Sequence, residues 1–134
     1  MRIEEVEGIG PAYAAKLETA GVKSTDDLLE RGAKPAGRTS LEAATGIDHA
    51  LILEWVNHVD LMRIDGVGSE YSDLLEAAGV DSPAELAQRN AGNLAMTIQE
   101  VVAARPSIVR RTPGEGEIQG WIDQSKSMKK IVEH

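Results

Sequence analysis

The amino-acid sequence predicts an all-α protein built from two related halves. Residues 3–33 align with residues 61–91 without a gap at an offset of 58, and twelve of the 31 positions are identical. Identity this high between two segments of one chain indicates an internal duplication. Apolar residues recur at spacings of three and four, which is typical of helices, and no segment alternates with period two for long. We therefore expect about ten short helices and no sheet.

The first long helix of each half has clear boundary signals. Pro11 suits the first position of a helix, where its missing N–H costs nothing. Gly21 and Gly79 are typical of the residue that follows a helix end. Ser24 and Ser82 each precede an acidic residue by three positions, which is the spacing of a capping box, so each is expected to begin the next helix.

Further helices are expected downstream in each half. Thr39 and Thr112 also precede a glutamate by three residues and are expected to begin helices. Residues 51–56, 94–104 and 116–128 show helical apolar spacing. Each half then consists of two helical hairpins.

The duplication sets the domain organisation. A chain of 134 residues holds one domain or two very small ones. We expect a first unit over residues 1–60 and a second over residues 61–134. The repeat extends to Trp55, whose surroundings align with those of Trp121. The second unit differs by an extended basic turn over residues 105–114.

Composition narrows the class of protein. Phe is absent and there are only two Trp and two Tyr, so the core is expected to consist of Leu, Ile, Val and Ala. The absence of Cys excludes disulfides and thiolate metal sites and fits a reducing cytosol. No apolar run approaches the roughly 18 residues of a membrane span, and the N-terminus lacks the apolar core of a signal peptide. We expect a cytoplasmic protein without membrane contact.

Charge is distributed unevenly along the chain. The formal net charge is −8, and an acidic surface repels phosphate backbones and membranes. Residues 92–134 carry six basic and five acidic groups, so only this third has a positive net charge. It is therefore the part best suited to attract a polyanion.

Each half carries a Gly-hydrophobic-Gly turn between two apolar segments: Gly8-Ile9-Gly10 in the first and Gly66-Val67-Gly68 in the second. Glycine permits positive φ values and close approach of backbones. The hydrophobic residue between the glycines is expected to fill the gap between two helices. Free N–H groups of such a turn, at the N-terminus of the next helix, form an arrangement that binds anions.

The stretches VEGIGPAYAAKL (residues 6–17) and IDGVGSEYSDLL (residues 64–75) resemble the helix-hairpin-helix motif. The chain through Trp121 also resembles the uncharacterised family called domain of unknown function 4332. This resemblance implies a tandem helix-hairpin-helix fold of the SAM-like type and no established activity. Helix-hairpin-helix proteins that bind DNA place the turn amides on phosphates without reading bases. Some relatives of the motif hold a cation on turn carbonyls, and the sequence leaves this open.

The two turns differ in charge. Lys16 follows the first turn, whereas Glu70 and Asp73 follow the second. Carboxylates beside an anion site oppose a phosphate by about 1 kcal/mol each near a surface. The first turn is therefore the better candidate for phosphate, although the glycines are needed to close the hairpin whether or not a ligand binds.

A second candidate surface for polyanions is basic. Arginine suits bidentate recognition of phosphate or carboxylate, and three arginines lie in the extended turn. The candidate residues are Lys16, Arg105, Arg110, Arg111, Lys126, Lys129 and Lys130. The favoured interpretation is that these groups simply balance the charge of the acidic first half, for which an interface between the units is one possible place.

No catalytic or metal-binding pattern is visible. His49 and His58 are nine residues apart, a spacing that does not converge on one metal. The chain lacks a nucleophile elbow, a P-loop and a dinucleotide-binding fingerprint, so we expect neither an enzyme nor a cofactor. The sequence favours a non-catalytic adaptor that binds another protein or itself. The alternative is sequence-independent binding of nucleic acid through the first turn and the basic C-terminal third.

Overall fold

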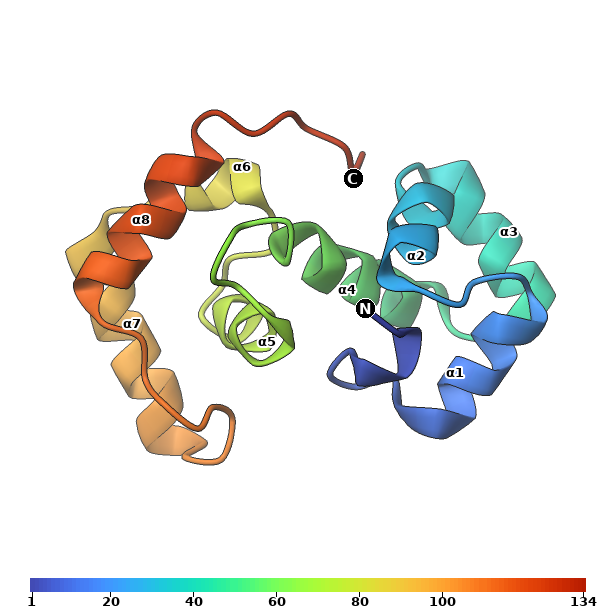
Figure 1. The fold of residues 1–134 in the computed structure, drawn as a ribbon, viewed down its shortest axis with the longest axis horizontal. Helices are drawn as coiled ribbons and strands as arrows, with labels where there is room; N and C mark the ends of the chain where they lie inside the picture. The colour runs from blue at the N-terminus through green and yellow to red at the C-terminus, as the bar shows by residue number, and fades with distance from the viewer. The chain divides into compact units, whose positions relative to one another are not determined.

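The computed structural model describes residues 1–134 and contains eight α-helices, one short 3₁₀ helix and no strand (Figure 1). The all-α class is confirmed, with fewer helices than the ten or so expected. The chain divides into two compact units: unit 1 comprises residues 1–60 and 131–134, and unit 2 comprises residues 61–130. Each helix falls short of the length and apolarity that a bilayer crossing requires.

Unit 1 contains the elements drawn from blue to green in Figure 1. They are η1 (Ile3–Glu5), α1 (Gly10–Thr19), α2 (Thr25–Gly32), α3 (Pro35–Thr45) and α4 (His49–Leu61, whose last residue is assigned to unit 2). Pro11 lies in the first turn of α1, and Gly21 follows its end with φ of 91°. Ser24 caps α2 by accepting the Asp27 N–H at 3.1 Å. These boundaries agree with the signals in the sequence.

Unit 2 contains α5 (Ser69–Ala77), α6 (Pro83–Leu86), α7 (Ala91–Ala104) and α8 (Glu115–Ser125). Ser82 caps α6 by accepting the Glu85 N–H at 3.2 Å, and Gly79 follows α5 with φ of 93°. The helix ends of unit 2 thus use the same residue types, 58 positions on, as those of unit 1.

Two of the expected helix starts are wrong. Thr39 lies inside α3, where its hydroxyl donates to the Pro35 carbonyl at 3.1 Å. Proline suits the first turn of a helix, and α3 begins at Pro35 instead. Thr112 lies outside α8, because Gly114 is the N-cap residue and donates its N–H to the Glu117 carboxylate at 3.3 Å.

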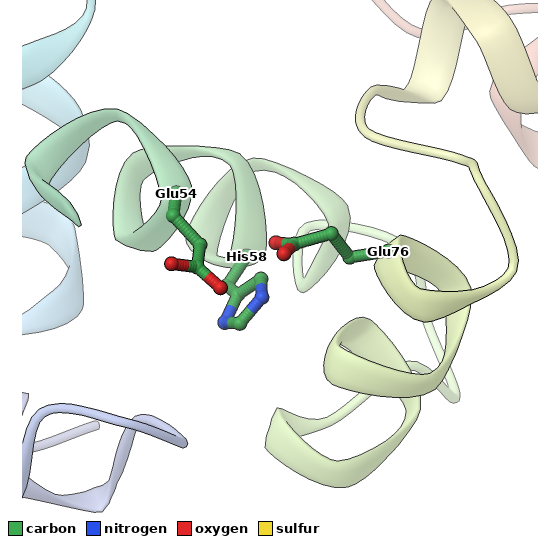
Figure 2. Close-up of side chains that lie close together, drawn as sticks. All are labelled: Glu54, His58 and Glu76. Carbon is green, nitrogen blue, oxygen red and sulfur yellow. The ribbon is translucent and has the colours of Figure 1, made fainter. Parts of the chain in front are cut away.

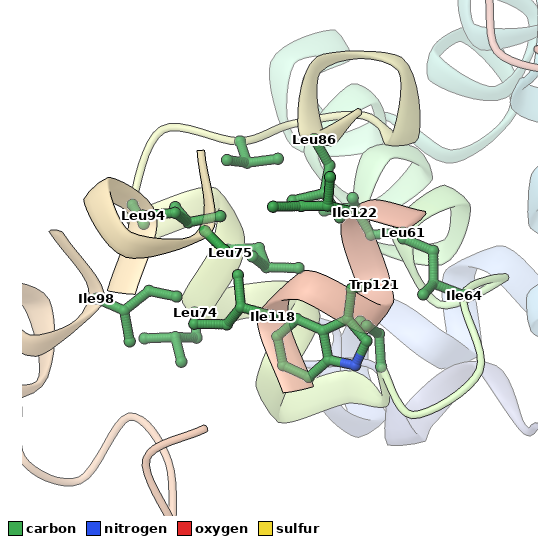
Figure 3. Close-up of a cluster of buried hydrophobic side chains, with 14 of the residues drawn as sticks. Leu61, Ile64, Leu74, Leu75, Leu86, Leu94, Ile98, Ile118, Trp121 and Ile122 are labelled. Carbon is green, nitrogen blue, oxygen red and sulfur yellow. The ribbon is translucent and has the colours of Figure 1, made fainter. Parts of the chain in front are cut away.

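Each unit has its own hydrophobic core. The core of unit 2 gathers aliphatic side chains around Trp121, as Figure 3 shows for residues from Leu61 to Ile122. The core of unit 1 gathers aliphatic side chains around Trp55 in the same way and includes Val132. As the composition predicts, Leu, Ile, Val and Ala supply nearly all of both cores.

The two cores contain matching aromatic pairs. The Tyr13 and Trp55 ring centroids lie 5.1 Å apart at an interplanar angle of 58°. The Tyr71 and Trp121 centroids lie 5.2 Å apart at 50°. Tilted pairs at this separation add to the stabilisation from apolar burial. Each pair joins the first long helix of a unit to its last helix.

An arginine secures the end of the first long helix in each unit. The Arg31 Nη1 donates to the Ala20 carbonyl at 3.1 Å, and the Arg89 Nη2 donates to the Gly79 carbonyl at 3.0 Å. Carbonyls at a helix end have no partner within the helix, so both contacts satisfy acceptors that would otherwise depend on water.

Residues 131–134 belong to unit 1, although the sequence pattern assigned them to the second unit. The chain leaves unit 1 after Asp60 and returns to it at Ile131. The physical reason is the burial of Val132, which is 1% exposed and part of the unit 1 core.

Candidate binding site

The first turn has the conformation that glycine permits. Gly8 and Gly10 have φ values of 88° and 62°, in the left-handed region that other residues rarely adopt. Ile9 between them is 3% exposed and belongs to the unit 1 core, as the sequence predicts. A Cβ added at Gly8 would lie 3.4 Å from the Trp55 Nε1. The backbone therefore passes close to the indole.

The second turn shares only part of this geometry. Gly66 has φ of 93°, and a Cβ there would approach the Trp121 Nε1 to 3.1 Å. Val67 is 4% exposed and lies in the unit 2 core. Gly68, however, has φ of −97° and open space where a Cβ would lie. Gly68 therefore does not use the positive φ that glycine permits, because the chain has already entered extended geometry there.

The helices that follow the two turns differ in their first residues. Neither α1 nor α5 has a side-chain hydrogen bond at its N-cap. The first turn of α1 contains no acidic residue, whereas Glu70 lies in the first turn of α5. A carboxylate there interacts favourably with the helix dipole and disfavours a second anion. The structure thus keeps the electrostatic contrast that the sequence indicates.

Glu70 binds the extended basic turn. It accepts the Arg110 backbone N–H at 3.0 Å and the Arg110 Nε at 2.8 Å, and the Arg110 Nη2 lies 2.7 Å from its carboxylate. The Arg110 side-chain hydrogen bond, helped by the backbone one, lowers the pKa of Glu70. Glu70 and Arg110 therefore form a hydrogen-bonded ion pair at the start of α5.

The other two arginines of the turn also face carboxylates. Arg111 forms a bidentate pair with Glu117, with nitrogen–oxygen distances of 2.7 and 2.9 Å. This pair lowers the pKa of Glu117, and it raises the pKa of Arg111. The Arg105 Nη2 lies 4.0 Å from the Asp73 carboxylate. Fork-to-fork contact is the strongest common geometry for such pairs.

The three arginines of the basic turn pair within their own unit, since Glu70, Asp73 and Glu117 all belong to unit 2. For these three residues, the carboxylates that balance the charge are therefore not those of the acidic first half. Glu70 and Arg110 are 40 residues apart in sequence, so no local spacing indicated the pairing. The structure brings Arg110 and Arg111 to the first turns of α5 and α8, and Arg105 to Asp73 further along α5.

The lysines of the predicted polyanion surface lie on other segments of the chain than the arginines do. Lys16 is exposed on α1 in unit 1, with its ammonium 5.9 Å from the centre of the Tyr13 ring. Lys126 lies 3.9 Å from the Asp123 carboxylate. Lys129 and Lys130 are exposed in the irregular segment after α8. The candidate residues therefore form several separate features.

The two histidines of α4 lie far apart along the helix. His49 begins the helix and His58 lies nine residues on, which separates them by roughly 13 Å along the axis. His58 is 2% exposed, and Glu54 lies one turn before it on the same side of α4 (Figure 2). The third side chain in Figure 2, Glu76, lies on α5 and belongs to unit 2.

Comparison with known proteins gives a family without an assigned role. The model of the family described as domain of unknown function (DUF4332) matches residues 7–128. Because this match covers most of the chain, the protein belongs to this family, which confirms the resemblance noted in the sequence. No curated protein and no solved structure matches the chain significantly.

Proposed function

We propose that the protein is a non-catalytic binding module made of two helix-hairpin-helix units, and that it is an adaptor for another protein or for a second copy of itself. The matching glycine turns, aromatic pairs and arginine contacts support two related hairpin units. The proposal includes a cytoplasmic location, which the absence of Cys favours.

The observation that carries the adaptor proposal is that the arginines of the basic turn form ion pairs with carboxylates of the same chain. Arg105, Arg110 and Arg111 each have a carboxylate within 4.0 Å. A phosphate would have to displace these carboxylates, so the turn gains little from contact with a nucleic acid. With the net charge of −8, this favours a protein partner over a polyanion.

Duplex binding in solution tests this proposal. Fluorescence anisotropy of a labelled DNA duplex, measured at low and at moderate salt, is expected to show no binding at tens of micromolar protein. Light scattering over the same concentrations reports self-association. Tight duplex binding with a log–log salt slope of roughly −2 to −4 would replace the adaptor proposal by backbone recognition.

A specific observation favours the second candidate, phosphate contact at the first turn. The N-terminus of α1 lacks both a side-chain cap and a first-turn carboxylate, and the exposed Lys16 lies on the same helix. An uncapped helix N-terminus attracts anions. Sequence-independent binding of nucleic acid through this turn would involve unit 1 only.

Charge reversal at one lysine separates the two candidates. If the first turn binds phosphate, Lys16→Glu weakens duplex binding and makes its salt slope shallower by about 1. Lys34→Glu is the matched control, because Lys34 is equally exposed in unit 1 but lies before α3. Equal weakening by both variants would indicate a general charge effect and would leave the turn without a role.

A further inference from the structure

Residues 131–134, hereafter the strap, are held on unit 1 by one buried side chain. Val132 is 1% exposed and lies in the same core as Trp55 and Leu41. Ile131 before it is 39% exposed. The strap has no helical structure, so a single aliphatic residue anchors an extended segment in the core.

A buried guanidinium binds the strap backbone. Arg38 is 2% exposed and donates to three carbonyl oxygens: Gly32 at 2.8 Å, Ala33 at 3.2 Å and Glu133 at 2.7 Å. Burial lowers the pKa of Arg38. Two of its acceptors come from the end of α2, and only the strap supplies the third. Without the strap, this buried donor loses a partner.

Two further hydrogen bonds fix the strap. The Glu133 N–H donates to the Ala33 carbonyl at 2.8 Å, and the His134 Nε2 lies 2.9 Å from the Asn57 Oδ1. The backbone of residue 133 is thus bound through both its N–H and, by way of Arg38, its carbonyl. Recognition of an extended backbone plus one apolar side chain is a common mode of peptide binding.

The chain that leads to the strap is irregular. Residues 126–130 lie between the end of α8 and Ile131 and have turn or no regular structure. Exchange of such a short segment between identical chains breaks few contacts and forms the same ones again. Here those contacts are one buried valine and a few hydrogen bonds.

We propose that unit 1 carries a binding site for an extended segment with a central aliphatic residue, that the strap of the same chain occupies it, and that the strap of a second copy can replace it. The site is defined by Ala33, Arg38, Asn57 and the core around Val132. This inference rests on contacts within unit 1 and holds whichever partner the module binds.

A peptide competition tests the site. The probe is a synthetic peptide of residues 126–134, titrated into ¹⁵N-labelled full-length chain. Val132→Asp in the chain places a charge in the core and releases its own strap, so the peptide is expected to bind this variant. It should bind the unaltered chain at least about tenfold more weakly, because a tethered strap has an effective concentration in the millimolar range. The same peptide carrying Val132→Asp is the control and should not bind.

Two outcomes would overturn the proposal. One is the absence of chemical-shift changes in a folded Val132→Asp chain at about 1 mM peptide, a concentration comparable to that of the tethered strap. The other is equal binding to the variant and to the unaltered chain. Circular dichroism establishes that the variant retains its helices.

Exchange between copies has a separate test that leaves Val132 in place. The chain has no Cys, so Ala33→Cys and Glu133→Cys can be made in separate chains and mixed under oxidation. The two backbones meet through a 2.8 Å hydrogen bond, and exchange therefore predicts an excess of the mixed disulfide. Met96→Cys, at an exposed position on α7, replaces Ala33→Cys as the control. A yield no higher than that of this control would exclude exchange.

Discussion

At the scale of single residues, the two glycine turns show that equal letters do not have equal roles. Gly66 has φ of 93° and approaches Trp121, so the backbone conformation and the packing both require glycine. Gly68, two residues on, has φ of −97° and free space around it. The sequence motif presents the two as one signal, and only the coordinates separate them.

Alanine is expected to be costly at Gly66 and nearly neutral at Gly68. Gly66→Ala forces a Cβ into the left-handed region and should lower the free energy of unfolding by about 1–2 kcal/mol. Gly68→Ala should change it by less than about 0.5 kcal/mol, because the restriction of the unfolded chain offsets the poorer preference of alanine for the N-cap position. Urea denaturation of both variants measures the difference, and a larger loss for Gly68→Ala would contradict the assigned turn geometry.

At the scale of helices, the capping patterns in the sequence predicted some helix starts correctly and others wrongly. Ser24 and Ser82 begin helices as predicted, since each hydroxyl accepts the N–H three residues on. Thr39 has the same spacing to a glutamate and lies within α3. Pro35 is an equally good start signal that lies earlier in the chain, and the helix that begins there continues through Thr39. At Thr39 the capping pattern is therefore overridden by the proline that begins the helix four residues earlier.

Removing the hydroxyls of Ser24 and Thr39 should show which of the two residues caps a helix. Ser24→Ala is expected to cost about 1 kcal/mol of unfolding free energy, because the Asp27 N–H loses its acceptor. Thr39→Ala should change stability by less than about 0.5 kcal/mol, since it removes an exposed group within a helix. Thermal unfolding followed by circular dichroism provides the comparison. Equal losses would place a helix boundary at Thr39 after all.

At the scale of the whole molecule, the sequence predicted the fold class and the buried positions better than the contacts between residues far apart in the chain. The helical class, the aliphatic cores and the buried Ile9 and Val67 follow from periodicity and composition, which act locally. The pairing of Glu70 with Arg110 and the return of Val132 to unit 1 depend on contacts between residues far apart in sequence. One sequence contains no signal that selects such partners, so neither contact could be predicted from it.

Acid should destabilise the protein through its paired carboxylates. The pKa values of Asp27, Glu70 and Glu117 are lowered in the folded state, Asp27 chiefly by the Lys23 N–H and the two glutamates by arginines. A lowered folded-state pKa contributes stability above the unfolded value, and this contribution is lost as pH falls through the folded value. The melting temperature should therefore decrease as the pH is lowered below about 4.5, which is the ordinary pKa of a glutamate side chain.

Neutral variants provide the check on this pH dependence. A chain with Glu70→Gln and Glu117→Gln should lose less of its melting temperature between neutral pH and pH 3 than the unaltered chain does. Glu100→Gln, at an exposed position on α7, is the matched control and should leave the slope unchanged. An identical acid slope in all three chains would show that the ion pairs of the basic turn contribute nothing to folding.

The placement of one indole in each core has a practical consequence. Trp55 and Trp121 are the only tryptophans of the chain. Trp55 is buried against a tyrosine of unit 1, and Trp121 is buried against a tyrosine of unit 2. Replacing either by phenylalanine leaves a single emitter whose fluorescence reports on one unit alone. Denaturation curves from two such proteins would reveal whether the halves melt together or one after the other, without any added dye.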